Sequence, residues 1–299
     1  SLNDYDFNAP KKDQLKTTAS TSKFANVDKY EHYEYTPYHD LPGLKELTTK
    51  RIEAEETTMN IVEGSSDCSS FYAGGMFKLA KHVIDEELGS YIVTAIKHRA
   101  FDNSYVTGSD GQSEYSNDFS CIPDTVHYRP PLSHPKPIIQ GPQSARVVGA
   151  SGEEIHIDEA GRIKVKFHWD RIGKEDENST CYMRVMQPWA GSGWGTSFIP
   201  RVGMEVVVNF FNGDPDRPVI TGSLYNKDNK PPFESKTQSG IKTRSTKGGG
   251  SSNFNELRFD DSAGSEQIYV HAEHNMDSVV EADETLTIGF GNRFIDAAD

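Results

Sequence analysis

The chain has 299 residues, of which 35% are hydrophobic and 25% charged, and its formal net charge at pH 7 is −14. Ordinary globular domains contain about 45–50% apolar residues counting glycine, so we expect an elongated fold or a core that other copies of the chain complete. Nucleic-acid binding usually requires lysine and arginine to neutralise phosphates, so the acidic excess argues against that class of function.

The three cysteines lie far apart, at Cys68, Cys121 and Cys181. Their odd number and wide spacing fit neither a disulfide framework nor a zinc site, and this usage is typical of synthesis in a reducing cytoplasm. Residues 1–12 lack the apolar core of a signal peptide, and no window approaches the roughly 18 apolar residues of a membrane span. We therefore expect neither a Sec-type signal nor a membrane anchor.

Residues 1–40 are polar and rich in tyrosine, and their weak periodicity indicates a few strands and loops. An apolar stripe at helical spacing then predicts a helix from Leu44 to Val62 that ends at Gly64. The stripe consists of Leu47, Ala54 and Ile61 together with Ile52 and Met59. The other face carries mixed charges, which usually face solvent: Lys45, Glu46, Lys50, Arg51, Glu53, Glu55 and Glu56.

Strands are predicted downstream of this helix. Met76–Leu79 follows two glycines, and Tyr91–His98 is rich in β-forming residues. A loop over 103–111 precedes a further predicted strand at Phe119–Ile122. Arg129–Pro142 contains five prolines, and because proline fixes its own backbone and disfavours helix before it, we expect a stiff extended connector and a domain boundary there.

The segment from Arg162 to Tyr225 contains short strands separated by turns rich in glycine and proline. Strict alternation predicts that one side of the first strand carries Ile163, Val165, Phe167 and Trp169. Further strands are predicted at 182–186, 204–211 and 219–225. The second of these three is nearly all apolar, and we expect it to be covered on both faces. This many short strands in about 65 residues favours a small closed barrel of the OB type.

The pattern changes after the barrel. Asn226–Ser252 is expected to be a second connector, with a glycine tract at 248–250. Very short apolar pairs then recur between polar turns, at Leu257/Phe259, Ile268/Val270, Val279/Val280 and Leu286/Ile288. Such an imperfect repeat is typical of a β-solenoid or an intertwined β-prism. One unit of this kind buries too little surface alone, so it requires further repeats or other chains.

Asp214 and Asp216 flank a proline, and glycosidases use carboxylate pairs. They lie in a turn between two barrel strands, where aspartate binds its own backbone, so a structural turn is favoured over catalysis. Glu153–Glu154 and Asp260–Asp261 are adjacent pairs whose side chains would point to opposite sides of a strand. Both pairs are interpreted as surface charge.

His271 and His274 invite a metal-binding interpretation, but residues i and i+3 of a strand point to opposite faces. Solvated or stacking histidines are favoured, and only a threefold axis would bring copies of one histidine together. His168 lies on the outward side of its strand, and no motif places a serine or cysteine nucleophile beside it. It is interpreted as a surface or interface residue.

Four aromatic residues would suit a stacking platform for single-stranded nucleic acid: Trp169, Trp189, Trp194 and Phe198. Because the chain is acidic and Trp169 is expected to point inward, contacts in the core or between copies are favoured instead. The tract at Gly248 lacks the spacing of a phosphate-binding loop and is interpreted as a linker. No catalytic, cofactor-binding or metal-binding residue is predicted.

Long motifs in a fixed order indicate a family. Gly152–Asn226, which contains QPWAGSGWG and NGDPDRPVITGSLYN, resembles the OB domain of VgrG proteins, the spike of bacterial type VI secretion. FNELRFDD and EQIYVHAEHNMDSVV resemble the start of the VgrG needle, while YIVTAIKHRA and YRPPLSHPKPIIQGPQSARVVG resemble the second half of its hub. Family members usually carry more hub sequence before the YDF segment and a longer needle, so we expect a fragment.

The resemblance implies a mainly β fold with a minor α+β part. Its implied regions are a partial hub domain at 1–128, a proline-rich connector at 129–150, an OB-fold barrel at 151–226, a linker at 227–253 and the start of a trimeric β-helix or β-prism at 254–299. The implied partners are two further copies in a homotrimer, the hexameric Hcp tube as a seat, a PAAR-repeat protein at the tip, and secreted effectors.

The resemblance further implies a structural role without enzymatic activity or cofactor. The trimer would be assembled in the cytoplasm and then secreted, or delivered into a target cell through a mechanically punctured envelope. Two other functions stay open: a spike that bears an enzymatic effector domain after Asp299, and a monomeric OB-type module that binds nucleic acid or sugar. The sequence after Asp299 decides the first, and a test for binding of single-stranded DNA addresses the second.

Overall fold

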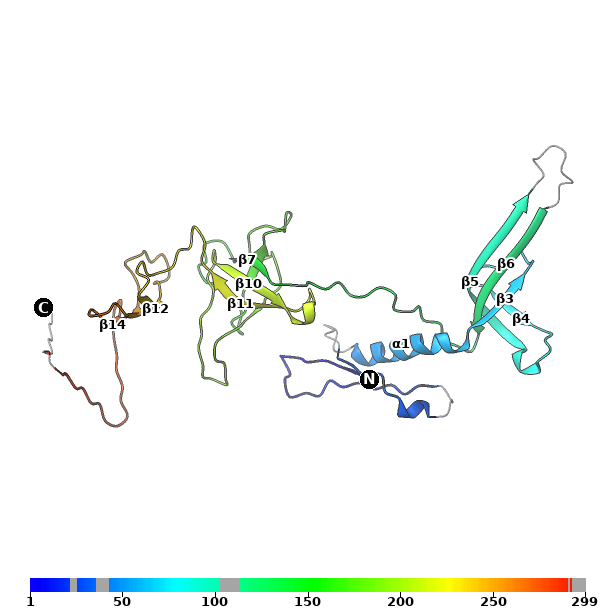
Figure 1. The fold of residues 1–299 in the computed structure, drawn as a ribbon, viewed down its shortest axis with the longest axis horizontal. Coiled ribbons are helices and arrows are strands. Elements are labelled where there is room, and N and C mark those ends of the chain that lie inside the picture. The colour runs from blue at the N-terminus through cyan, green and yellow to red at the C-terminus, as the bar shows by residue number, and fades with distance from the viewer. Residues whose placement is uncertain (22–25, 36–42, 103–112, 290, 292–299) are drawn as a thin grey trace. The chain divides into compact units, whose positions relative to one another are not determined.

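The computed structural model describes residues 1–21, 26–35, 43–102, 113–289 and 291. Its regular structure is mostly β, with one α-helix in the described part, which confirms the predicted mainly β fold (Figure 1). The chain forms two compact units, the first from 1–141 with 210–217 and the second from 142–209 with 218–299. Among the described residues, no helix has both the length and the apolar character needed to cross a membrane.

The first unit begins with a short parallel pair of strands, β1 (Leu2–Asn3) and β2 (Glu34–Tyr35). Leu2 also forms an antiparallel bridge with Lys16, and a 3-10 helix, η1, occupies Val27–Lys29. The prediction of a few strands and loops is therefore confirmed for the described part of this region.

The helix α1 runs from Leu44 to Thr57 and continues as a 3-10 turn, η2, over Thr58–Asn60. The predicted end at Gly64 is wrong, because this glycine lies in strand β3 (Val62–Ser66), which pairs with β6. A Cβ at Gly64 would lie 2.7 Å from Cζ of Phe119. Glycine therefore serves the close packing of two strands here and does not terminate the helix.

The buried face of α1 differs from the predicted stripe. Leu44 is fully buried, and Thr48 and Thr57 are nearly so. Each threonine satisfies its hydroxyl by donating to the carbonyl oxygen four residues earlier. Met59 and Ile61, which belong to the predicted stripe, lie beyond the helix and are exposed.

Part of the charged face of α1 is engaged by other segments. Glu53 forms a 2.6 Å ion pair with Arg129 at the start of the proline-rich connector. Glu56 accepts hydrogen bonds from Ser20 and Thr21 of the N-terminal segment. The prediction of a solvated face is therefore wrong for these two carboxylates. Their partners lie far from the helix in sequence, so the helical pattern alone could not indicate these contacts.

A four-stranded antiparallel sheet completes the first unit, in the order β3-β6-β5-β4. β4 (Met76–Leu79) matches the prediction. β5 (Gly89–Asp102), preceded by the 3-10 helix η3 (Asp85–Glu87), and β6 (Ser113–Pro123) extend beyond it, because the two pair along nearly their whole length. The predicted loop over 103–111 lies outside the described residues.

The core beside this sheet is aromatic. The ring centroids of Phe71, Phe77 and Phe119 lie 5.1–5.6 Å apart, and Tyr91 stacks on Phe77 at 5.7 Å. Tilted and edge-to-face arrangements at these distances are favourable for aromatic pairs. Rings that come from a loop and from three strands thus hold this part of the unit together.

The second unit contains a five-stranded sheet in the order β8-β7-β10-β11-β9. The strands are β7 (Gln143–Val148), β8 (Lys164–Phe167), β9 (Arg184–Val185), β10 (Glu205–Phe210) and β11 (Pro218–Leu224). An antiparallel bridge between Ile163 and Met183, with backbone bonds of 3.0 and 2.7 Å, joins the ends of β8 and β9. This bridge closes the sheet into a barrel and confirms the predicted OB-type fold.

The fully buried side chains of the barrel include Ala145, Val147, Ile163, Val165, Val206, Val208 and Ile220. In β10 only every second residue is fully buried, so the expected cover on both faces is wrong. The inward position predicted for Trp169 is also wrong. β8 ends at Phe167, and the turn that follows leaves Trp169 65% exposed, with its Nε1 donating to Oε1 of Gln143 at 2.9 Å.

Two strands lie in segments that were expected to be connectors. Residues 129–142 carry no regular secondary structure, as predicted, but the next segment forms β7 and pairs with both β8 and β10. β12 (Gln238–Lys242) likewise lies within the expected linker. Both strands owe their conformation to partners that are distant in sequence, so local composition did not indicate them.

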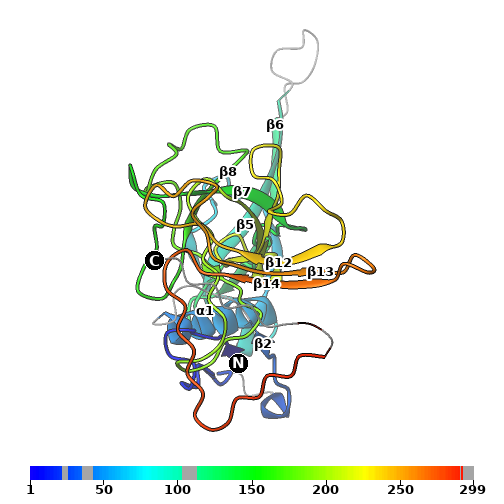
Figure 2. The same ribbon diagram turned by 90° about the vertical axis from the view of Figure 1, so that its left-hand side faces the viewer.

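The second unit also contains a three-stranded antiparallel sheet in the order β12-β13-β14, whose strands lie side by side in Figure 2. β13 (Glu256–Asp260) and β14 (Gln267–His271) contain the first two predicted apolar pairs. The other two pairs, at 279–280 and 286–288, carry no regular secondary structure. The predicted repeat therefore forms strands only in its first half.

Candidate assembly surfaces

The three-stranded sheet has two chemically different faces. Leu257 lies opposite Ile241 on one side and Val270 on the other, and Phe259 lies opposite Ile268. Residues paired across antiparallel strands point to the same side, as do residues two apart. These five side chains therefore form one surface, here called the apolar face. All five are exposed, from 39% for Phe259 to 70% for Ile268.

The opposite face is polar and better buried. Glu256 is 5% exposed and pairs with Lys242 at 3.3 Å and with Arg258 at 2.8 Å. The Lys242 ammonium lies 3.7 Å from the ring centroid of Phe254, and the Arg258 guanidinium lies 4.7 Å from that of Tyr269. Each cation thus has both a carboxylate and an aromatic ring as partners. The charges of this face are matched within one chain.

This burial pattern is the reverse of that in a one-sided sheet that folds alone, where the apolar face is covered and the polar face is solvated. A contiguous exposed apolar surface marks an interaction site on a protein in water. Burying a large apolar side chain completely gains about 1.5–3 kcal/mol. Covering the apolar face therefore contributes favourably to the free energy of association.

The acidic turn after the 3-10 helix η4 (Phe211–Gly213) is structural. Asp214 Oδ1 accepts from the backbone N–H of Asp216 at 3.0 Å. Lys136 pairs with both carboxylates, at 2.7 and 2.9 Å, and the Asp214 side chain is 3% exposed. A carboxylate so enclosed leaves no room for a reacting group. The predicted turn is confirmed, but its lysine partner lies 78 residues away and was not predicted.

A second ion pair anchors the end of the same turn. Arg217 Nη2 donates to both carboxylate oxygens of Asp4, at 2.6 and 2.7 Å, and the Asp4 side chain is fully buried. Charge-assisted bonds of this kind are stronger than neutral ones. The two residues are 213 positions apart, and no sequence pattern connects them.

The two histidines of β14 and its following turn have separate surroundings. His271 Nδ1 lies 3.0 Å from the carbonyl oxygen of Phe254, and its ring stacks on Tyr269 with the centroids 6.2 Å apart. His274 is exposed and contacts Asn275 Oδ1 at 2.8 Å. These are the stacking and solvated histidines that were predicted. Within the described ranges, no group of three potential ligands is placed to hold a metal ion.

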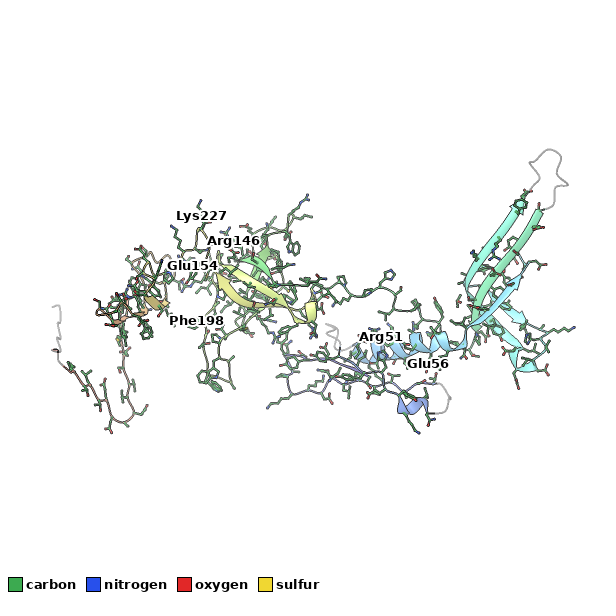
Figure 3. All side chains as sticks on the ribbon, viewed as in Figure 1. Arg51, Glu56, Arg146, Glu154, Phe198 and Lys227 are labelled. Atoms are coloured by element: carbon green, nitrogen blue, oxygen red, sulfur yellow. The ribbon has the colours of Figure 1, made fainter. Side chains whose placement is uncertain are left out.

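The four aromatic residues of the barrel do not form one platform. Trp189 and Trp194 meet edge to face with their centroids 5.0 Å apart. The side chain of Gln187 is hydrogen-bonded to the backbone of Phe198, which Figure 3 labels among the side chains of the barrel region. Trp169 is bound elsewhere, at the start of β7. All four are more than half exposed. The predicted place in the barrel core is therefore excluded for these four residues. Of the two contacts that the sequence favoured, only the one between copies remains.

Glu154, in the loop after β7, binds the glycine tract. Its carboxylate accepts from Gly248 N at 2.8 Å and from Thr246 Oγ1 at 2.9 Å, and the Gly248 N–H is the main reason that the pKa of Glu154 lies below its ordinary value. Asp260 similarly accepts from Gln238, which lowers the pKa of Asp260. Neither carboxylate is simple surface charge, and the tract is not a free linker.

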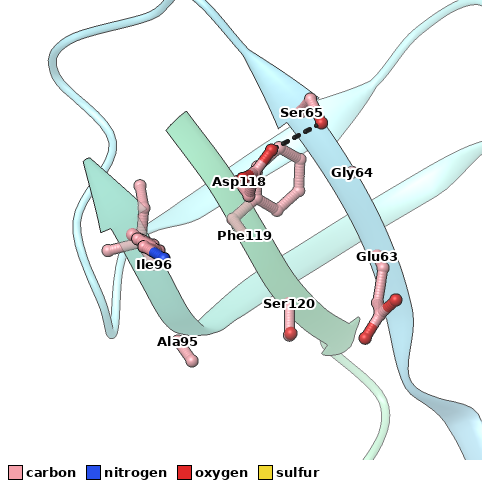
Figure 4. A pocket seen from close by; sticks show the side chains of 9 residues that line it. Glu63, Gly64, Ser65, Ala95, Ile96, Asp118, Phe119 and Ser120 are labelled. Atoms are coloured by element: carbon pink, nitrogen blue, oxygen red, sulfur yellow. Dashed lines mark hydrogen bonds between the residues drawn. The ribbon is translucent and has the colours of Figure 1, made fainter. Parts of the chain in front are cut away.

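A shallow groove of about 540 Å³ lies on the four-stranded sheet (Figure 4). Its polar lining residues are Glu63, Ser65, Lys97, Asp118 and Ser120. Asp118 is already engaged, since it accepts from Ser65 and pairs with Arg99, both at 2.9 Å. No histidine or cysteine lines the groove, so it offers no nucleophile paired with an imidazole base.

Comparison with known proteins matches three parts of the chain. Residues 1–104 match the phage tail baseplate hub (GPD), 150–225 the type VI secretion system/phage-baseplate injector OB domain, and 239–295 the bacteriophage T4 gp5 C-terminal trimerisation domain. The type VI secretion system spike protein VgrG1a of Pseudomonas aeruginosa is 41% identical over 293 residues, which cover 96% of this chain and 45% of that protein. The chain belongs to the VgrG family.

The predicted family resemblance is thus confirmed. This VgrG chain spans less than half the length of the Pseudomonas spike protein. The actin cross-linking toxin VgrG1 of Vibrio cholerae is 38% identical over 293 residues, which cover 96% of this chain and 26% of the toxin. A solved structure of the E. coli c3393 protein, described as a type VI secretion component similar to T4 gp27 and gp5, has a TM-score of 0.43 at 24% identity and covers 60% of this chain and 43% of that one.

The family matches agree with the surfaces described above. The trimerisation match begins at Ser239 in β12 and includes β13 and β14, so every residue of the apolar face lies within it. The OB match includes the barrel strands β8 to β11. The apolar face, which is uncovered in a single chain, therefore lies in the segment that matches a domain named for trimerisation.

Proposed function

We propose that this chain is the hub, barrel and needle base of a homotrimeric spike of type VI secretion. The observation that carries the proposal is the apolar face, five exposed apolar side chains within a segment that matches a trimerisation domain. Cyclic assembly of three copies would bury all three faces in equivalent surroundings. The low hydrophobic content of the chain fits a core that is shared between copies.

The proposed role is mechanical and non-enzymatic. The hub region would seat on the Hcp tube, and the needle would receive a PAAR-repeat tip protein. Effectors would travel with the spike from the cytoplasm to the outside or into a target cell. The proposed domains are a hub at 1–128, a connector at 129–142, a barrel at 143–226, a linker at 227–237 and a needle base from 238. The barrel and the needle base begin earlier than the sequence predicted, because they include β7 and β12.

Light scattering across a dilution series tests the homotrimer. A trimer of the 33.3 kDa chain has a mass of about 100 kDa. Ile268→Asp places a charge in the apolar face and should leave monomers where the parent chain is trimeric, because an unpaired carboxylate is costly to bury. Gln267→Asp is the matched control, since it adds the same charge to the opposite face of β14 and should stay trimeric.

Two results would contradict the homotrimer. One is a parent chain that remains monomeric at every concentration. The other is equal dissociation of the Ile268→Asp and Gln267→Asp variants, which would mean that added charge acts regardless of the face that carries it.

A second candidate is a spike that bears an enzymatic effector domain after Asp299. The observation that favours it is the 38% identity to a relative named as an actin cross-linking toxin, of which this chain covers 26%. Reading the coding sequence downstream of residue 299 tests it. A stop codon directly after the needle would contradict this second candidate.

A further inference from the structure

The segment between β9 and β10 presents large apolar side chains to solvent. Trp189 and Trp194 are 63% and 58% exposed, and Met186 and Phe198 are more than half exposed as well. From Gln187 to Pro200 there is no charged residue, although charged residues make up 25% of the chain. This charge-free stretch is called the tryptophan hairpin below.

The tryptophan hairpin holds its rings in a fixed arrangement. Gly191 N donates to the carbonyl oxygen of Trp194 and Thr196 N to that of Trp189, both at 2.9 Å. Gly195 has φ 132°, and a Cβ there would lie 2.5 Å from the Trp189 carbonyl oxygen. Glycine is therefore required for the backbone to approach so closely. The two indoles then meet edge to face at 75°.

A rigid, exposed aromatic pair within a charge-free stretch has the composition of an interface core. Interface cores are depleted of charged residues and enriched in aromatic ones, and tryptophan is prominent among the residues that dominate binding energy. Side chains that are already fixed lose little entropy when a partner covers them. In the part of the chain that the structure describes, the indole N–H groups of Trp189 and Trp194 donate to no acceptor, so both are available as donors.

We propose that the tryptophan hairpin is a second contact between copies of this chain, formed by the barrels and separate from the apolar face. The proposal rests on the homotrimer of the proposed function. Charge favours a copy of the chain as the occupant. Each chain carries a net charge of −14, so copies repel one another over most of their surface, and a charge-free hairpin is suited to the place where they touch.

The connection to the trimerisation segment also favours a copy. Only residues 225–237 separate the end of β11 from the start of β12. In addition, Glu154 of the barrel binds Thr246 and Gly248 next to the sheet. Once three sheets associate, three barrels are held near the same axis at an effective concentration in the millimolar range. Even a contact that is weak on its own would then form.

Fluorescence quenching tests the contact directly. The chain has three tryptophans, so Trp169→Phe leaves only those of the hairpin as reporters. We expect acrylamide to quench them several-fold less in the trimer than in the monomeric Ile268→Asp variant of the same background. Equal quenching in trimer and monomer overturns the proposal.

A dissociation measurement tests its energetic weight. Trp189→Ala combined with Trp194→Ala should raise the concentration at which the trimer dissociates by about tenfold or more. Ile172→Ala is the matched control, because Ile172 is apolar and 96% exposed but lies outside the hairpin, and it should leave dissociation unchanged. Equal effects of the two variants overturn the contact.

Light-scattering masses separate the two proposals. A parent chain that is monomeric throughout contradicts both the homotrimer and the hairpin contact. A trimeric parent whose hairpin tryptophans are quenched as freely as in the monomer contradicts the hairpin contact alone. A trimer in which they are protected supports both.

Discussion

The barrel and the three-stranded sheet lie in the same unit and are built from equally short strands, yet they bury their apolar residues differently. In the barrel, the bridge between Ile163 and Met183 closes the sheet, and Val206 and Val208 become fully buried within one chain. In the three-stranded sheet, the edges stay apart and Leu257 and Ile268 remain exposed. Closure of the sheet, more than composition, distinguishes the barrel, which buries its core within one chain, from the three-stranded sheet, which requires other copies to cover its apolar face.

This difference has a thermodynamic consequence. Stability that comes from a closed core is independent of protein concentration, whereas stability that comes from association increases with concentration. The two regions can therefore be distinguished by substitutions placed in each and measured at several protein concentrations.

The largest expected effect is in the barrel core. Ile220→Ala removes a fully buried side chain from β11, and we expect it to lower the free energy of unfolding of the barrel by about 2–5 kcal/mol. Urea denaturation monitored by tryptophan fluorescence measures this loss, which should be the same at low and high protein concentration. A loss that changes with concentration would show that the barrel is not complete within one chain.

The next effect is on the apolar face. Phe259→Ala should weaken trimer association by about 2 kcal/mol, or roughly thirtyfold in the dissociation constant, as for a central aromatic contact in an interface. Light scattering against concentration measures the shift. The circular dichroism of the dissociated chain should be unchanged, because Phe259 is already 39% exposed there. Unfolding of the isolated chain would argue that this ring supports the fold of a single chain.

A smaller effect is expected from the polar face. Glu256→Gln removes the charge that Lys242 and Arg258 share, and should cost about 1 kcal/mol because hydrogen bonds to a charged group are replaced by weaker ones. Protection of the β13 amides from hydrogen exchange measures it. Glu266→Gln, an exposed position in the turn before β14, is the matched control. Equal losses in both variants would indicate a general charge effect.

The smallest effect is a dependence on pH. Hydrogen bonds from Gln238 and Thr237 hold the pKa of Asp260 below its ordinary value. A depressed pKa means that the stabilisation is fully present above the unfolded value, about pH 4, and is lost as pH falls through the folded value. Asp260→Asn should therefore make the acid-induced loosening of the sheet shallower. Identical acid profiles for parent and variant would contradict this assignment.

Much of the fold follows from local pattern. Alternation in the sequence places Ile163, Val165 and Phe167 on the buried side of β8, and the first two apolar pairs predict β13 and β14. The pattern fails at Trp169 because nothing in the alternation signals that the strand ends two residues earlier. A period-two pattern reports which residues suit a strand, and it does not report where pairing stops.

The long-range contacts within each unit have no local signal. Lys136 with Asp214, Arg217 with Asp4, and Glu154 with Gly248 each join residues 78 to 213 positions apart. An ion pair of this kind depends on the folded arrangement of two segments, and either partner alone looks like any surface charge. The strands β7 and β12 were missed for the same reason.

The order of strands in the barrel bears on how it carries a pulling force. The chain enters the barrel through β7 and leaves through β11, and both strands are hydrogen-bonded to β10 between them. Gln143, at the start of β7, pairs with Val208 near the end of β10, whereas Leu224 ends β11 toward the beginning of β10, since the turn at 211–217 reverses the chain. Tension along the chain would therefore pull β7 and β11 in opposite directions along their own axes. The backbone hydrogen bonds on both sides of β10 would then bear that load together, in shear. Strands loaded in shear resist rupture far better than strands whose hydrogen bonds are peeled apart one at a time.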